Sequence, residues 1–198
     1  MPRAGLSPEV IVSEAARLVD EVGRDRLTLA ALAKRFGVAQ PSLYKHVDGL
    51  DGLHGLLAVK VLREVGETLR RAGTGKAGSA ALRAVAKAYR AYALGHPGCY
   101  GYVLRAPTAK DHDLEAAATE ILSVLNDVFA GYGITGNSAI DAARFVRSTL
   151  HGFVSLELGG GFGMPRSVDH SFGRLVAATD QALTGWTEAK PGRTPRPR

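Results

Sequence analysis

The stretch that decides the fold runs from Thr28 to Val47 and reads TLAALAKRFGVAQPSLYKHV. Its first half carries apolar residues at the spacing of one helical face: Leu29, Leu32, Ala33 and Phe36. Gly37 follows at once, and glycine readily adopts the positive φ that a tight turn after a helix needs. Pro41 then suits the first turn of a second short helix, because its missing N–H has no helical partner there. The stretch predicts two short helices joined by a tight turn.

The second of these helices exposes a row of polar, hydrogen-bonding side chains. Ala33 is small enough to let the two helices approach, and we expect their contact to bury Leu32, Phe36, Val38 and Leu43. The outward-facing residues are Gln40, Pro41, Ser42, Tyr44, Lys45 and His46. Glutamine pairs with adenine through two hydrogen bonds, lysine donates to guanine or phosphate, and the other polar types suit phosphate oxygens or thymine methyl groups. This is the anatomy of a helix-turn-helix whose second helix fits a major groove.

The same stretch resembles the DNA-binding domain of the tetracycline-repressor (TetR) family of bacterial transcriptional regulators. The similarity covers about Ser7 to Val65, and its most specific part is Leu43-Tyr44-Lys45-His46-Val47 after the Gly37-Val38 turn. The resemblance implies a three-helix DNA-binding head, a linking fourth helix and a helical body that binds a ligand and dimerises. It also places Thr28 on the DNA backbone. It places six residues in or beside the groove of a double-stranded operator: Gln40, Pro41, Ser42, Tyr44, Lys45 and His46.

Basic charge is concentrated in this part of the chain. Residues 24–47 hold five basic side chains against Asp25, a net charge of +4, while the whole chain carries +6. Residues 190–198 add four basic side chains and no acid, so the total charge says less than its distribution. Many family members carry a phosphate-binding lysine near the start of the fourth helix, where this chain reads Asp48-Gly49-Leu50-Asp51. We therefore expect phosphate contact at this position to come from backbone N–H groups or to be absent. Affinity for DNA would then depend more on Arg3 and on Arg24 or Arg26.

Helical periodicity dominates the rest of the chain, without a clear alternating strand pattern. We predict an all-α protein of about nine helices. Residues 1–48 form the helix-turn-helix domain, 49–72 a linking helix, 79–186 a ligand-binding and dimerisation domain, and 187–198 a disordered basic tail, with a glycine-rich joint at 73–79. The predicted N-caps are Ser7, Thr28, Asp48, Asn137 and Ser167.

The C-terminal half resembles a TetR-type ligand domain with a Trp-His-Gly motif on its penultimate helix. Here the motif reads Leu150-His151-Gly152-Phe153, so leucine replaces tryptophan, and Arg147 precedes it by one turn. We expect a pocket for a mostly apolar, aromatic or anionic inducer. Its expected lining is Tyr89, Tyr92, Tyr102, Arg105, Arg147 and His151. The alternatives are aromatic core packing for the tyrosines and a structural hydrogen bond for Arg147 and His151.

We expect a homodimer held together by the last two helices, residues 138–158 and 168–184. Their apolar stripes, together with Gly152, suit a four-helix bundle between two copies. Leu150 is expected on this outer face.

Several function classes find no support in the residues. A single cysteine, Cys99, excludes an internal disulfide framework and fits a reducing cytosol. No apolar run approaches the ~20 residues that span a bilayer. Asp111, His112 and Asp113 do not form a metal site, because the side chains of consecutive helical residues point in different directions. The glycines of 159–163 miss the spacing of a nucleotide-binding loop. We expect neither metal, cofactor nor enzyme activity.

The sequence therefore predicts a cytoplasmic, ligand-responsive regulator, a repressor that binds a palindromic operator as a homodimer and is released by a small-molecule inducer. Two other classes stay open, a helical enzyme and a protein-binding adaptor without DNA binding. Tyr44 and His46 would then be partly buried helix residues with no ligand.

Overall fold

The computed structural model describes residues 5–108 and 111–186, and within these ranges every regular element is a helix. This confirms the predicted all-α class. In chain order the elements are α1 (Pro8–Val22), η1 (Arg24–Arg26), α2 (Leu29–Phe36), η2 (Gln40–Lys45), α3 (Gly49–Gly73), α4 (Gly78–Gly95), η3 (Cys99–Leu104), α5 (His112–Ala130), α6 (Gly136–Leu158) and α7 (Val168–Thr184), where η marks a 3-10 helix. Arg3 and the predicted basic tail, 187–198, lie outside the described residues.

Residues 5–48, which we call the head, fold as the local signals predict. The Ser7 side chain accepts the backbone N–H of Val10 at 3.3 Å, and the Thr28 side chain accepts that of Ala31 at 3.0 Å. Gly37 ends α2 in the left-handed conformation, with φ 64° and ψ 33°. The head therefore owes its element boundaries to side chains that lie next to them in the sequence.

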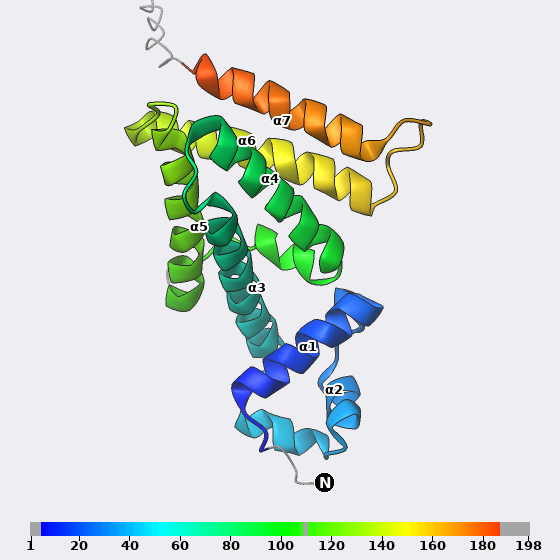
Figure 1. Ribbon diagram of the computed structural model, residues 1–198. Helices are drawn as coiled ribbons and strands as arrows, with labels where there is room; N and C mark the ends of the chain where they lie inside the picture. Colours follow the sequence, from blue (N-terminus) through cyan, green and yellow to red (C-terminus); the bar gives the residue numbers. More distant parts are fainter. Residues whose placement is uncertain (1–4, 109–110, 187–198) are drawn as a thin grey trace, which may run out of the picture.

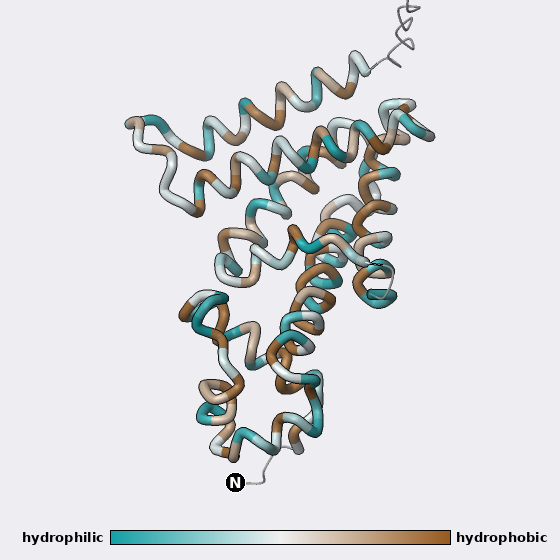
Figure 2. Tube along the Cα trace, turned by 180° about the vertical axis from the view of Figure 1, so that it is seen from behind, coloured by the Kyte–Doolittle hydropathy of each residue, from teal (hydrophilic) through white to brown (hydrophobic). Residues whose placement is uncertain are grey.

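The long helix α3 connects the head to the body, which is formed by residues 74–108 and 111–186 (Figure 1). Its buried face includes Leu53 and Leu57 close to the head, and Val61, Val65 and Leu69 packed against the helices of the body. Figure 2 shows hydrophobic and hydrophilic residues alternating along this helix and its neighbours. Because one helix supplies side chains at both ends, the head and the body share one continuous hydrophobic core.

The helices α6 and α7 lie side by side at the end of the molecule farthest from the head (Figure 1). Leu150 on α6 is only 4% exposed, so it packs inside the protomer, and the expectation that it lies on the outer face is wrong. The outer face of this pair carries Gly152, around whose Cβ position the space is open.

Two of the five predicted caps differ in detail. α6 begins two residues earlier than expected, at Gly136 with Thr135 at its N-cap, so Asn137 lies within the first turn instead of capping it. Asp48 occupies the N-cap of α3, but its side chain accepts no capping hydrogen bond. Ser167 caps α7 as predicted by accepting the N–H of His170 at 3.3 Å. In the described ranges, no helix is both long and apolar enough to cross a membrane.

Candidate functional site

The segment after the Gly37 turn exposes its polar side chains around a single buried anchor. It is a 3-10 helix, η2, with three residues per turn, so residues three apart share a face. Leu43 is fully buried, whereas Tyr44 is 55% exposed. Pro41 and Tyr44 are exposed on one face, and on the next face Lys45 is exposed while Ser42 is half-buried. The arrangement leaves the expected DNA-reading side chains on the surface of the head.

Two of the remaining predicted groove residues lie at the ends of this segment. Gln40 is exposed, and its Nε2 donates to the hydroxyl of Tyr44 at 3.3 Å, which orients both side chains. His46 is half-buried and follows the last residue of η2. The segment thus presents a short, preorganised polar edge.

The N-terminus of α2 lies in the same head and offers hydrogen-bond donors. The Thr28 oxygen accepts the Ala31 N–H as a cap, so its own exposed O–H is free to donate. The first turn of α2 contains no acidic residue. A helix N-terminus without a carboxylate has the partial positive charge and the free N–H groups that bind a phosphate.

Arg35 contributes its charge inside the head. Its guanidinium lies 2.6 Å from a carboxylate oxygen of Glu14 and 2.6 Å from one of Glu21, which joins α2 to α1. The hydrogen bond from Arg35 lowers the pKa of Glu21 below its usual range. This arginine therefore fixes the packing of the two helices, and its charge is matched within the head.

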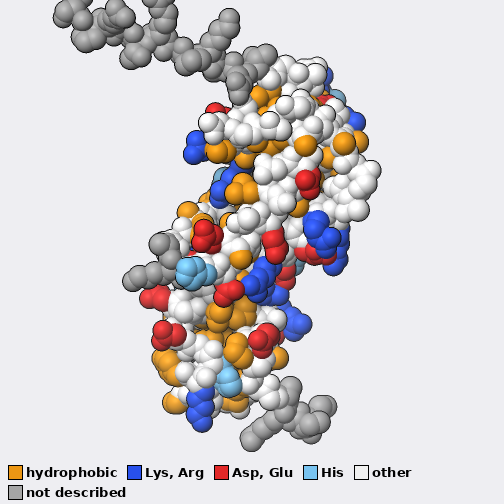
Figure 3. Space-filling model, turned by 90° about the vertical axis from the view of Figure 1, so that its left-hand side faces the viewer, with side chains coloured by type: hydrophobic (Ala, Val, Ile, Leu, Met, Phe, Trp, Pro, Cys, Tyr) orange, Lys and Arg blue, Asp and Glu red, His pale blue; other side chains and the backbone are white. Residues whose placement is uncertain are grey.

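Arg24 lies against the body. Its guanidinium carbon sits 4.8 Å from the centre of the Tyr102 ring, which directs its charge toward the body, and its expected contact with DNA phosphates stays a prediction. Arg26, Lys34 and Lys45 stay as exposed cations of the head. On the face shown in Figure 3, Lys and Arg side chains alternate with Asp and Glu instead of forming one basic patch.

The six residues expected to line a ligand pocket fall into three separate places. The first contains Tyr89 and His151, linked through Tyr100: the two tyrosine hydroxyls lie 2.9 Å apart, and that of Tyr100 lies 2.6 Å from Nδ1 of His151. Ser155 continues the chain at 3.1 Å from Nε2 of His151. Arg147 lies close by and donates to the carbonyl oxygen of Val103 at 3.1 Å.

This first group, Tyr89, Tyr100, His151 and Ser155, is a hydrogen-bonded chain that joins α4, η3 and α6. Burial raises the pKa of Tyr89, and burial together with the charge of Arg147 lowers the pKa of His151, so at neutral pH the group presents hydroxyls and a neutral imidazole. Sequence reasoning missed Ser155, which the four-residue spacing from His151 on one helix would have revealed.

Of the other expected pocket residues, Tyr102 and Tyr92 bond to side chains of α3, and Arg105 lies beside the N-cap of α5. The Tyr102 hydroxyl lies 2.6 Å from Nδ1 of His54 on α3, and burial raises the pKa of Tyr102 to about 12. Arg105 lies 3.8 Å from Asp111. Tyr92 donates to a carboxylate oxygen of Glu64 at 3.1 Å.

An open groove of about 300 Å³ lies elsewhere, beside the α3–α4 turn and α5. It is lined by Arg70, Lys76 and Asp127 among others, none of which was expected in a site. In the described ranges, no group of three His, Cys, Asp or Glu side chains is placed to hold a metal ion.

Two family models match this chain. The one described as bacterial regulatory proteins, tetR family, matches residues 11–49, and the one described as tetracyclin repressor-like, C-terminal domain, matches residues 82–179. The first covers the head and the second most of the body.

Similar proteins agree with these matches. The HTH-type transcriptional regulator Rv0681 of Mycobacterium tuberculosis is 40% identical over 158 residues, which are 79% of this chain and 72% of that protein. The class D tetracycline repressor protein of Escherichia coli is 41% identical over 59 residues, 30% of this chain and 27% of the repressor. The crystal structure of the regulatory protein SCO4313 superposes with a TM-score of 0.71 at 28% identity, covering 87% of this chain and 94% of that one. The chain belongs to the TetR family and is a DNA-binding transcriptional regulator of the repressor type.

Proposed function

We propose that this regulator is a cytoplasmic repressor that binds a palindromic operator as a homodimer and is released by a small-molecule inducer. The observation that carries the proposal is the geometry of η2, in which buried Leu43 fixes the segment while Tyr44 and Lys45 face outward. A segment that served only to fill the core would not leave a 55% exposed tyrosine hydrogen-bonded to an exposed glutamine.

We assign the DNA contacts by side-chain chemistry. Gln40 reads an adenine in the major groove, and Lys45 donates to guanine or to phosphate. Pro41, Ser42, Tyr44 and His46 contact thymine methyl groups or phosphate oxygens along the groove edge. Thr28 and the N-terminus of α2 bind a backbone phosphate, which sets the register of η2 on the duplex.

The proposed dimer forms through the outer faces of α6 and α7. Gly152 on α6 and Gly173 and Ala177 on α7 are exposed and small, which allows helices of two copies to approach closely. Gly152→Arg leaves the protomer core intact because nothing lies within 4 Å of its Cβ position. We expect monomers in sedimentation for this variant and dimers for Ala116→Arg on the exposed face of α5.

The proposed inducer binds where Tyr89, Arg147 and His151 meet η3. A ligand that replaces their internal hydrogen bonds shifts η3, and η3 also touches the head through Tyr102 and its neighbours. An inducer acts only if it binds one arrangement of head and body more tightly than the other. In this proposal Tyr102, which contacts Arg24 of the head, and Arg105, at the end of η3, transmit the shift of η3 to the head.

Selection from a randomised duplex library, followed by an electrophoretic mobility shift, tests the DNA-binding proposal. We expect an enriched palindrome with two half-sites about one helical turn, ~34–36 Å, apart or a multiple of it. Gln40→Ala should relax base preference at one position per half-site by about 1–3 kcal/mol. If no duplex is enriched, the operator proposal fails and the enzyme and adaptor classes return.

A further inference from the structure

The last turn of α1 and the turn between α4 and η3 lie backbone against backbone. A Cβ atom on Gly98 would lie 2.1 Å from the carbonyl oxygen of Val19 and 2.9 Å from the Cα atom of Asp20. Gly98 has φ −73° and ψ −41°, values that any residue adopts. Glycine is therefore required here by the closeness of the two segments. We call residues 16–20 and 96–99 together the head–body joint.

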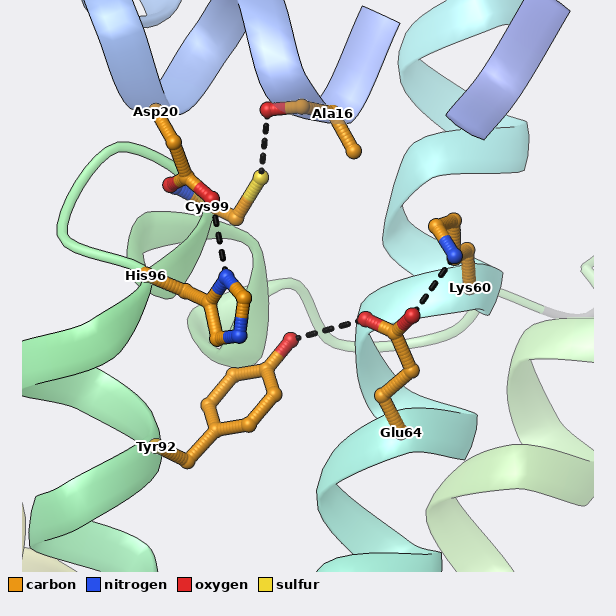
Figure 4. Close-up of polar contacts among 7 residues, drawn as sticks. All are labelled: Ala16, Asp20, Lys60, Glu64, Tyr92, His96 and Cys99. Atoms are coloured by element: carbon orange, nitrogen blue, oxygen red, sulfur yellow. Dashed lines mark hydrogen bonds and ion pairs between the residues drawn. The ribbon is translucent and has the colours of Figure 1, made fainter. Parts of the chain in front are cut away.

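Both carboxylate oxygens of Asp20 are bonded across this joint (Figure 4). Oδ1 accepts the backbone N–H of Cys99 at 2.9 Å, and Oδ2 lies 2.9 Å from Nδ1 of His96. Cys99 is the first residue of η3, so its N–H has no partner inside that helix, and Gly98 at the N-cap has no side chain to supply one. Asp20 therefore caps η3 from a different part of the chain.

The helix α1 does not itself stabilise a carboxylate at position 20. Asp20 lies near the C-terminal end of α1, where the helix dipole disfavours negative charge, and the last turn of α1 holds no basic residue. The carboxylate is thus stabilised by the body and not by its own helix.

The joint extends to the linking helix α3. The rings of His96 and Tyr92 lie 4.7 Å apart between their centres, and the Tyr92 hydroxyl donates to Glu64 of α3 at 3.1 Å. Lys60 donates to the other carboxylate oxygen of Glu64 at 2.6 Å. Figure 4 shows these side chains converging from α1, the end of α4 and α3. Hydrogen bonds and one ring contact therefore connect the head, the body and the linking helix in series.

A thiol adds a further contact between the same segments. Sγ of Cys99 donates to the backbone oxygen of Ala16 at 3.4 Å. Burial and the neighbouring carboxylate of Asp20 raise the pKa of Cys99 to about 12, so the thiol keeps its proton at neutral pH. Beyond the joint, Arg24 lies over the ring of Tyr102, so both ends of η3 touch the head.

We propose that Asp20 is the positioning residue that fixes the angle of the head relative to the body and thereby sets the half-site spacing that the dimer accepts. The inference rests on the proposed function, because spacing has meaning only for two heads of one dimer. With Asp20 bonded to Cys99 and His96, head and body move as one unit. Without it, the head is held by apolar contacts, the Arg24–Tyr102 stack and the weak hydrogen bond from the Cys99 thiol to Ala16, and it then samples a range of angles.

A distance measurement within one protomer tests the joint without DNA. Spin labels on Lys34→Cys in the head and Ser123→Cys on α5 occupy exposed positions, whereas Cys99 is 2% exposed and protected from labelling. Pulsed electron paramagnetic resonance then measures the distance between the two labels. Labelled protein is diluted in unlabelled protein so that only distances within one protomer are recorded. We expect one narrow distribution for the otherwise unaltered chain and a broad one when Asp20→Ala is added.

Glu21→Ala is the matched control for this measurement. Glu21 is the next carboxylate in the same turn, but its partner, Arg35, lies within the head, so its removal leaves the joint unchanged. Equal distribution widths for Asp20→Ala and Glu21→Ala would overturn the proposal. Asp20→Asn keeps an oxygen that accepts the Cys99 N–H and should restore a narrower distribution.

Operator spacing gives the second readout, which loss of stability alone would not change. Duplexes selected by the unaltered protein are rebuilt with two base pairs added or removed at their centre, and affinities are compared. We expect about tenfold discrimination between spacings for the unaltered protein and for Glu21→Ala, and its near loss for Asp20→Ala. Unchanged discrimination by a folded Asp20→Ala protein would overturn the inference. If the unaltered protein enriches no duplex, the proposed function fails, while the distance measurement still decides whether Asp20 holds the head.

Discussion

Gly37 lies in the head, directly before η2, the proposed DNA-facing segment, and Gly98 lies in the body, against the last turn of α1; they are glycine for different reasons. Gly37 has a positive φ of 64° and open space around its Cβ position. Gly98 has an ordinary conformation, but its Cβ position is filled by the backbone of Val19. The DNA-facing region is thus shaped by local conformation and the joint by tertiary contact, so the two regions should respond differently to substitution.

The largest effect should come from the anchor of the DNA-facing region. Leu43→Ala removes its one fully buried side chain, and we expect a loss of about 2–5 kcal/mol in the free energy of unfolding, measured with urea. Tyr44→Ala, at the exposed neighbour, should change it by less than about 0.5 kcal/mol. Similar losses for both would show that η2 is not held by Leu43.

Gly98→Ala should be the next most costly. Its Cβ would overlap the Val19 carbonyl, so α1 and η3 must separate, at a cost of about 1–3 kcal/mol in thermal unfolding. Gly95→Ala is the control, because nothing lies within 4 Å of that Cβ position and its φ is not positive. If Gly98→Ala leaves the stability to thermal unfolding unchanged, the two segments of the head–body joint can separate without a cost in free energy.

Substitution by asparagine distinguishes the positive φ at Gly37 from the close backbone contact at Gly98, with a smaller expected change in the free energy of unfolding. At Gly37 an alanine should cost about 1–2 kcal/mol because of its left-handed conformation, and asparagine, which tolerates that region, should cost less. At Gly98 the order should reverse, because asparagine is larger than alanine. Calorimetry on the four variants gives the comparison, and the same order at both positions would contradict the distinction.

The smallest effect concerns the charge of the DNA-facing region. If Lys45 binds a phosphate, Lys45→Ala should lower the slope of log affinity against log salt by about one. Lys87→Ala, on the exposed face of α4, should leave the slope unchanged. An unaltered slope with lost discrimination at one base pair would assign Lys45 to a base instead.

Structural features could be predicted from the sequence wherever the residues that determine them lie close together along the chain. Ser7, Thr28 and Ser167 cap helices as predicted, and Gly37 adopts the predicted turn, because each acts on residues within four positions. The boundaries of α3 and α4 follow the apolar periodicity and the glycine-rich turn between them. The all-helical fold is predictable for the same reason.

What the sequence did not reveal depends on which faces of distant helices meet. Leu150 shares its apolar character with outer-face residues, so periodicity alone assigned it to the wrong side. Tyr89, Tyr92 and Tyr102 look alike as aromatic residues, yet each bonds a different partner. Asp20 and Cys99 are 79 positions apart, and neither carries a local signal of the other.

The continuity of α3 limits how this regulator can be recombined with its relatives. A DNA-reading segment exchanged at the start of α3 would separate Leu53 and Leu57 from the head they support and would leave Asp20 facing a foreign turn. A working chimera therefore has to carry α1 through α3 together with the turn that holds Gly98. If the proposed function holds, operator preference depends on a unit whose two parts, α1 through α3 and the turn at Gly98, are not contiguous in the gene.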